Sequence, residues 1–253
     1  MNNFTAHKIS DSVTRINDIP DNIISRVDSY LVTGTATAAL IDTCISPGLY
    51  NFVRELTPLP LIVLITHGHG DHAGQSCIEF MENNIPLYMK TVDIPILREG
   101  PGGSVEGLSF ININDGMTFD LGGRVLETIP LPGHTPGSVI FFDRENQILF
   151  SGDTIGSGAF WMQLPYSSSL TDFLRELKCL EEIVKGYDNL TILPGHIYQA
   201  MEPPGSGYIK DLHEATEKII SGEIVGVKSE FSYGGLTVDY KSLRGFIYNP
   251  DRL

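Results

Sequence analysis

Three histidines and an aspartate lie within six positions of the segment LIVLITHGHGDHAG, residues 61–74. An apolar, strand-like run precedes them, and Gly68 and Gly70 lack the Cβ that would hinder a tight backbone path. Imidazoles and carboxylates suit Zn²⁺ or another borderline divalent metal, whereas Ca²⁺ and Mg²⁺ draw on oxygen ligands. Neighbouring histidines without a metal repel when protonated and cost free energy when buried unpaired. The segment therefore indicates a metal site.

Three later apolar runs also end at a potential ligand. LETIPLPG leads into His134, ILFSG into Asp153 and LTILPG into His196. If the four strands share a sheet, their carboxyl ends meet at one edge, where α/β proteins place their sites. A catalytic zinc usually has three protein ligands and a water, so seven ligands suffice for two metals. The candidate ligands are His67, His69, Asp71, His72, His134, Asp153 and His196.

Length and composition favour one globular unit. The chain has 253 residues, 42% of them hydrophobic and 19% charged, which is enough to bury a sizeable core without the polarity of a disordered protein. No charge run or low-complexity segment marks a linker, so we expect a single domain over residues 1–253. The tail at residues 222–253 is too mixed in pattern to assign.

The net charge and the short apolar runs limit the classes of partner that we expect for this chain. A formal net charge of -14 opposes a phosphate-backbone partner, so nucleic acid is not expected as a substrate. No apolar run reaches signal-peptide or membrane-spanning length, and the three cysteines occur singly rather than in pairs. We therefore expect a cytoplasmic protein that acts on a small molecule and has no membrane contact. The oligomeric state stays open.

The element pattern alternates short strands with helices. SYLVTG and TAALIDT predict a hairpin that turns at Gly34, and GLYNFVREL predicts a short helix. A second helix is expected from Ala73 to Asn84. In SLTDFLRELKCLEEIVKG, the apolar residues fall at helical spacing, which indicates a core-facing helix. YIKDLHEATEKII predicts one more helix.

The metal motifs resemble those of the metallo-β-lactamase superfamily. THGHGDHAG is similar to its THxHxDH motif, and PGHTPGS, SGDT, LPGH and the opening SYLVTGTATAALIDT follow the family's order between about Val13 and His196. The resemblance implies a four-layer αββα sandwich of two mixed sheets with helices outside, with the site at one sheet edge and Asp42 near the metal loop. It implies two metal sites that Asp153 bridges. The first would be held by His67, His69 and His134, and the second by Asp71, His72 and His196.

Departures from the family pattern indicate which branch of the superfamily the chain resembles. Asp153 is typical of the glyoxalase II, lactonase and ribonuclease-like branches, whereas β-lactamases tend to carry Cys or Ser there. His69 stands where flavodiiron oxidoreductases carry Glu. We therefore expect a metal-dependent hydrolase with two divalent ions, most simply Zn²⁺, with Fe or Mn as alternatives. A bridging hydroxide would attack the carbonyl of a thioester or lactone, and Asp71 would orient that water.

Other functions also stay open for this chain. The same fold also serves a mononuclear iron dioxygenase that oxidises persulfides, and a phosphodiesterase is a further alternative. A scaffold with a vestigial site would show ligand losses, and the motifs show none.

Substrate contacts are expected beside the bridging aspartate. The candidates are Phe160, Trp161, Met162, Tyr166 and Tyr198. Packing of these aromatic side chains inside the core is the alternative. The Gly-rich loop at residues 99–107 is expected to be a surface connection rather than a flap.

Overall fold

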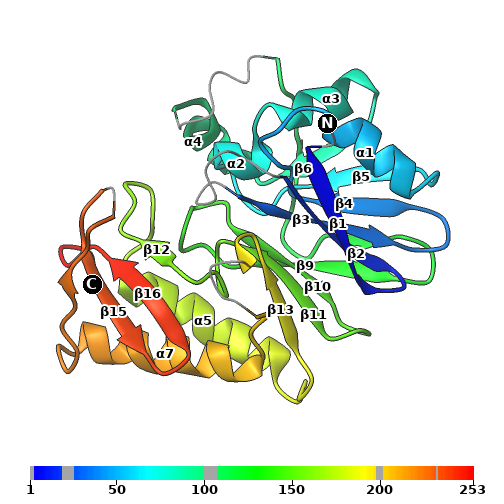
Figure 1. Ribbon diagram of the computed structural model, residues 1–253. Coiled ribbons are helices and arrows are strands. Elements are labelled where there is room, and N and C mark those ends of the chain that lie inside the picture. The colour runs from blue at the N-terminus through cyan, green and yellow to red at the C-terminus, as the bar shows by residue number, and fades with distance from the viewer. Residues whose placement is uncertain (1–2, 19–25, 100–106, 198–201, 232) are drawn as a thin grey trace.

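The computed structural model contains three β-sheets with helices packed on their faces (Figure 1). It describes residues 3–18, 26–99, 107–197, 202–231 and 233–253. No helix within these ranges is long and apolar enough to span a membrane.

A seven-stranded mixed sheet forms the N-terminal half. Its first four strands are antiparallel, and the next three continue in parallel. The hairpin predicted at Gly34 is present, because the Gly34 amide donates to Thr37 O at 3.0 Å. The strands are β1 (Phe4–Ser10), β2 (Val13–Asp18), β3 (Asp28–Thr33), β4 (Ala38–Ile41), β5 (Leu61–Leu64), β6 (Leu87–Met89) and β7 (Ile111–Asn112).

A five-stranded mixed sheet packs against the first. Its order is β13-β11-β10-β9-β8, and only β13 and β11 pair in parallel. The strands are β8 (Thr118–Asp120), β9 (Val125–Pro130), β10 (Val139–Asp143), β11 (Ile148–Gly152) and β13 (Thr191–Pro194).

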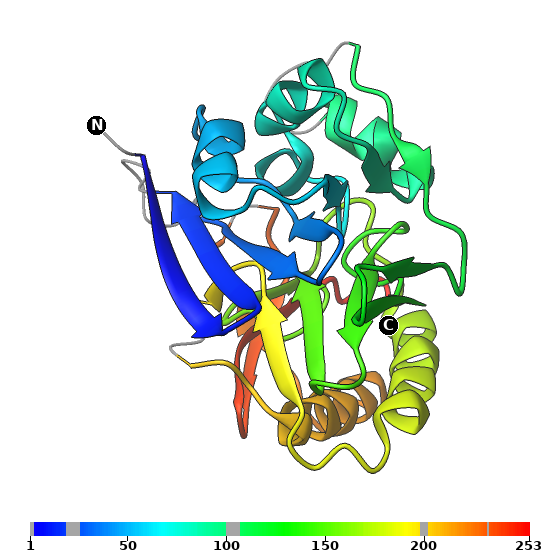
Figure 2. The same cartoon turned by 90° about the vertical axis from the view of Figure 1, so that its right-hand side faces the viewer.

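Alternating side chains build the layers, because successive residues of a strand face opposite sides. Between the two sheets, Tyr30 and Ile41 share a buried cluster with Phe141. On the outer face of the first sheet, Leu40 packs with residues of α1 (Leu49–Leu56) and α3 (Ser76–Glu82). On the outer face of the second, Phe142 packs against α5 (Leu170–Val184) and α7 (Ser206–Ile220). The predicted αββα order is therefore confirmed (Figures 1 and 2).

A third sheet extends beyond the two that were expected. The C-terminal segment, which the sequence left unassigned, forms three strands that join a strand from the middle of the chain in the order β12-β16-β15-β14. Phe160, Phe246 and Val238 from this sheet share a buried cluster with α5 and α7. The strands are β12 (Phe160–Met162), β14 (Val227–Lys228), β15 (Leu236–Tyr240) and β16 (Leu243–Tyr248).

The helix expected from Ala73 to Asn84 is interrupted. It divides into α2 (Gly70–Ala73) and α3, and Gly74 lies between them. Gly74 has a ψ of -142°, outside the helical range, so the helix ends there. A Cβ at this position would come within 2.0 Å of Gly70 O, so only glycine fits. The other short helices are η2 (Thr91–Asp93) and α4 (Ile94–Glu99). The single-domain organisation stays a prediction.

Candidate metal centre

The strands that lead into the candidate ligands come from both sheets of the sandwich. β5 belongs to the seven-stranded sheet, whereas β9, β11 and β13 belong to the five-stranded one. β9 and β11 are each antiparallel to β10, and β13 is parallel to β11, so these three strands point in the same direction. The expectation of one shared sheet edge is thus corrected, because the ligands meet where the edges of two packed sheets face each other.

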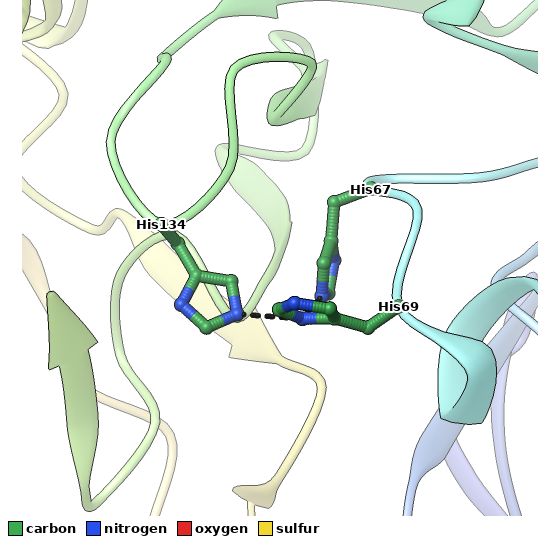
Figure 3. A group of neighbouring side chains, drawn as sticks. All are labelled: His67, His69 and His134. Atoms are coloured by element: carbon green, nitrogen blue, oxygen red, sulfur yellow. Dashed lines mark hydrogen bonds between the residues drawn. The ribbon is translucent and has the colours of Figure 1, made fainter. Parts of the chain in front are cut away.

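Three histidines form the first group of ligands. His69 Nδ1 lies 3.0 Å from both His67 Nε2 and His134 Nε2. Figure 3 shows the three rings pointing toward one another, with His67 and His69 on one loop and His134 on another. The group is the same as the one implied for the first metal, and its candidate atoms all lie within 4.8 Å of one another.

Two carboxylates and two histidines lie beside that group. His196 Nε2 is 3.6 Å from Asp71 Oδ2 and 3.2 Å from Asp153 Oδ2. The other Asp153 oxygen, Oδ1, is 3.5 Å from His72 Nε2, and Asp153 Oδ2 is 3.8 Å from His134 Nε2. Asp153 therefore lies between the two groups, which is the position expected of a bridging ligand.

Hydrogen bonds orient four of the five rings. His134 Nδ1 lies 2.7 Å from Trp161 O and His196 Nδ1 2.7 Å from Arg26 O, so each ring donates to a carbonyl oxygen. Each ring that carries its proton on Nδ1 keeps a lone pair on Nε2, and an acceptor that binds the Nδ1 proton fixes the orientation of a metal-binding histidine.

Asp42 orients the other two rings. His72 Nδ1 lies 2.9 Å from Asp42 Oδ2. The Thr66 hydroxyl donates to the same oxygen at 2.8 Å, so it accepts from His67 Nδ1, 3.0 Å away. All four Nε2 lone pairs thus converge on the centre.

The pKa shifts separate the two groups. Burial, together with the neighbouring imidazoles, lowers the pKa of His67 well below its usual value, and burial with His69 lowers the pKa of His134 to about 4. Burial also opposes the charged form of His72, but the Asp153 and Asp71 carboxylates raise its pKa to about 10. The first group therefore offers neutral nitrogens, and the two carboxylates of the second group favour a positive charge beside them. A divalent cation supplies that charge when it displaces the proton of the His72 imidazolium.

Two further observations fit a bound metal. His72 Nε2 is buried and has no hydrogen-bond partner among the described residues, although buried polar atoms are normally paired. A Cβ on Gly195 would come within 2.4 Å of His72 Cε1 and 2.8 Å of Asp153 Oδ1, so only glycine lets the backbone pass this close to the ligands. The donor set and its spacing are consistent with metal binding.

Asp42 supports the metal loop from a strained backbone position. Besides the bonds already described, its Oδ1 accepts from Thr66 N at 2.8 Å. Asp42 has a φ of 57°, in a region that non-glycine residues rarely adopt, and such strain often accompanies functional sites. The family resemblance placed Asp42 near the metal loop, and the hydrogen bonds agree.

Asp93 is a supporting residue that the sequence analysis missed. Its carboxylate is fully buried and accepts hydrogen bonds from Gly68 N at 2.9 Å, Thr135 Oγ1 at 2.6 Å and Gly137 N at 2.7 Å. It thereby joins the loop of His67 and His69 to the loop of His134. Its only sequence signal is an aspartate shortly after a strand, and that signal does not reveal that β6 lies beside β5.

The proposed substrate residues occupy different environments. Phe160 and Met162 are each 1% exposed and pack in the hydrophobic core, contrary to the expected pocket wall, because they lie on the inward face of β12. Trp161, between them, faces the other side and is partly exposed. Tyr166 is 40% exposed, and its hydroxyl donates to Glu99 on α4. Tyr198, like most of the Gly-rich loop at residues 99–107, lies outside the described residues.

Comparisons with known proteins identify relatives that match between 49% and 68% of the chain. The acyl-coenzyme A thioesterase MBLAC2 of Gallus gallus is 28% identical over 192 residues, covering 68% of this chain and 69% of that protein. The hydroxyacylglutathione hydrolase of Synechococcus sp. (strain JA-2-3B'a(2-13)) is 30% identical over 126 residues, covering 49% of this chain and 46% of that protein. The names of these relatives agree with the predicted class of metal-dependent hydrolase.

Solved structures support the fold. A metallo-beta-lactamase from Pontibacter korlensis superposes with a TM-score of 0.66 at 18% identity, covering 85% of this chain and 99% of that one. Metallo-beta-lactamase IND-7 gives 0.67 at 19% identity, covering 86% and 100%. Residues 24–196 match the family model described as the metallo-beta-lactamase superfamily, which is more than half of the chain. The chain therefore belongs to the metallo-beta-lactamase superfamily, as its motifs predicted.

Proposed function

We propose that this chain is a dinuclear metal-dependent hydrolase of small thioesters. The observation that carries the proposal is the convergence of four oriented Nε2 atoms on a centre that also holds the carboxylate of Asp153 between two ligand groups. An acyl-coenzyme A and an acylglutathione are both S-acyl thioesters. The names of the relatives therefore support a thioester in preference to a lactone.

The candidate ligands form two sets, one for each metal ion. Two bound divalent ions supply a water of lowered pKa and polarise the carbonyl oxygen under attack. We assign His67, His69 and His134 to one ion, Asp71, His72 and His196 to the other, and Asp153 to both. The mixed nitrogen and oxygen set favours Zn²⁺.

Asp71 is the candidate for orienting the attacking water and accepting its proton. Its carboxylate is 31% exposed, against 16% for Asp153, so it is the more accessible of the two. The thiol product has a pKa of about 8.5, so the thiolate leaves near neutral pH without a strong general acid. We also propose a small-molecule substrate and a cytoplasmic setting.

A substrate panel tests the proposal. Zinc-loaded protein should hydrolyse S-acyl thioesters of coenzyme A or glutathione with kcat/KM on the order of 10⁴ M⁻¹s⁻¹ or higher, and lactones and phosphodiesters much more slowly. Asp153→Ala should remove this activity. Asp11→Ala is the matched control, because the Asp11 side chain is fully exposed and pairs with Lys8 at the surface, so its activity should equal that of the wild type.

Two results would overturn the proposal. The first is a lack of thioester hydrolysis by protein that carries zinc. The second is one iron per chain together with oxygen uptake on glutathione persulfide, which would identify a dioxygenase instead.

A further inference from the structure

The short strand β12 presents one aromatic ring away from the core. Successive side chains of a strand face opposite sides, so Phe160 and Met162 point toward α5 and α7 while Trp161 points to the opposite face. Trp161 is partly exposed. A partly exposed tryptophan between two buried neighbours leaves apolar surface available for a ligand.

The backbone of Trp161 connects this face to the metal centre. β12 is the edge strand of its sheet, and its inner neighbour is β16. The Trp161 carbonyl accepts the hydrogen bond that orients His134, at 2.7 Å. The backbone that carries the Trp161 ring is therefore held directly against a ligand of the first group.

The C-terminal hairpin contributes a second ring. Phe231, between β14 and β15, packs against Trp161 with 5.5 Å between ring centroids and an interplanar angle of 58°. Phe231 is nevertheless 45% exposed. This hairpin lies beyond residues 24–196, the part of the chain that matches the family model, so the ring pair combines the shared fold with an element outside that match. Figure 1 shows the C-terminal strands beside β12.

We propose that Trp161 and Phe231 form an aromatic platform that binds the apolar acyl chain of the thioester. The inference rests on the proposed function, since it concerns the substrate of the same site. An alkyl chain laid on the two rings removes apolar surface of both from water, and each buried methylene strengthens binding by roughly threefold to fourfold. The platform thus selects longer acyl chains over short ones.

A binding experiment tests the platform without turnover. Trp161 is the only tryptophan in the chain, so its fluorescence reports on this surface directly. The metal-loaded protein is titrated with S-ethyl, S-hexyl and S-dodecyl thioethers of coenzyme A, which cannot be hydrolysed, below their micelle concentrations. Tryptophan emission should change, and the affinity should rise with chain length.

Two variants localise the effect. Phe231→Ala should weaken binding of the S-dodecyl thioether by about tenfold or more, because it removes one of the two rings. Val225→Ala is the matched control, since Val225 is 73% exposed and lies outside the ring pair, and its binding should equal that of the wild type. Trp161→Ala, followed by calorimetry, should weaken binding similarly and keep the wild-type metal content, because the backbone carbonyl that holds His134 remains.

The outcomes separate the platform from the proposed function. Affinities that do not depend on chain length, or equal affinities for Phe231→Ala and the wild type, would overturn the platform even if zinc-loaded protein hydrolyses thioesters. Chain-length-dependent binding that Phe231→Ala weakens would support the platform even if hydrolysis is absent, in which case only the proposed function fails.

Discussion

The metal centre and the aromatic platform are joined by the hydrogen bond between His134 and the Trp161 carbonyl, and they are built in opposite ways. At the centre, buried groups such as Asp42 and Asp93 hold the loops through several hydrogen bonds each. On the platform, Trp161 and Phe231 meet through ring contact and stay partly exposed. The contrast indicates that changes at the centre should alter metal binding and stability, whereas changes at the platform should alter substrate preference.

Asp93→Ala should have the largest effect, because it removes the acceptor for three donors that join two metal loops. Buried donors left unpaired cost about 1–3 kcal/mol each, so the free energy of unfolding should fall by about 3 kcal/mol or more. Loss of a supporting contact should also weaken metal binding by about 10- to 100-fold. Urea titration and metal competition measure the two effects.

Asp93→Asn is the matched control. It keeps one acceptor oxygen and the side-chain volume, so its losses should be smaller than those of Asp93→Ala. If both variants kept wild-type metal affinity, the two metal loops would not depend on Asp93. The contrast between a centre held by buried hydrogen bonds and a platform held by ring contact would then fail.

Asp42→Asn should act on metal binding more than on folding. Asparagine tolerates the positive φ of this position. Its amide nitrogen in the place of Oδ2 would donate to His72 Nδ1, which moves the His72 proton to Nε2 and blocks that lone pair. The Thr66 hydroxyl would lose the same oxygen and could no longer accept from His67 Nδ1, so we expect an affinity loss of about 10- to 100-fold at both metals. Metal titration followed by calorimetry measures it, and an unchanged affinity would contradict the assigned tautomer.

Arg252→Ala should loosen the platform and leave the centre intact. The Arg252 guanidinium donates to Gln163 O at 3.1 Å and Pro165 O at 3.2 Å, and also to Leu164 O and Ser167 O, so it holds the loop that follows β12. Hydrogen bonds of a charged group suggest a loss of about 1–3 kcal/mol in the free energy of unfolding. Long acyl chains should lose part of their advantage over short ones in kcat/KM.

Arg252→Lys serves as the control for charge. A single ammonium cannot match the planar set of guanidinium donors, so the lysine variant should resemble Arg252→Ala in chain-length preference. A lower metal content in either variant would show that the loop also supports the centre.

The thiols should show the smallest effect. Burial raises the pKa of both Cys44 and Cys77 from the usual 9.0 to about 12. The folded state holds these protons more tightly than the unfolded chain, so the contribution is complete below pH 9.0 and is lost as the pH rises toward 12. Between pH 8 and pH 9.5, each thiol should lower the free energy of unfolding by about 0.8 kcal/mol.

Urea titrations at both pH values measure this loss, and Cys77→Ala should remove half of the thiol contribution. Cys179 is exposed on α5, so one thiol per native chain should react with a thiol reagent at pH 8 and three after unfolding. Rapid reaction of all three thiols in the native protein would contradict the burial of Cys44 and Cys77.

The metal ligands are predictable from sequence because each one follows an apolar strand within a few residues. This pattern predicts the ligands His67, Asp153 and His196. The assignment of their strands to two different sheets could not, since sheet order is set by pairing between segments far apart in the chain. For the same reason Asp93 was missed, because its partners Gly68 and Gly137 come from other segments.

The substrate side is predictable only in part. The run at Phe160 and Trp161 was identified as aromatic, but three letters of a strand do not show which face is buried. The tail at residues 222–253 lacks a clean alternation because β14 is short and exposed, β15 has one buried residue, and β16 ends in three successive buried residues. Phe231 therefore gave no sequence signal, and its role depends on a contact between distant segments.

Metal stoichiometry tests the central claim most directly. Purified protein saturated with zinc and freed of excess metal should hold two ions per chain. His69→Ala should hold about one, because it disrupts the first group and leaves Asp71, His72 and His196 intact. A single ion in the wild type, or an unchanged content in His69→Ala, would contradict a two-metal centre built from these seven residues.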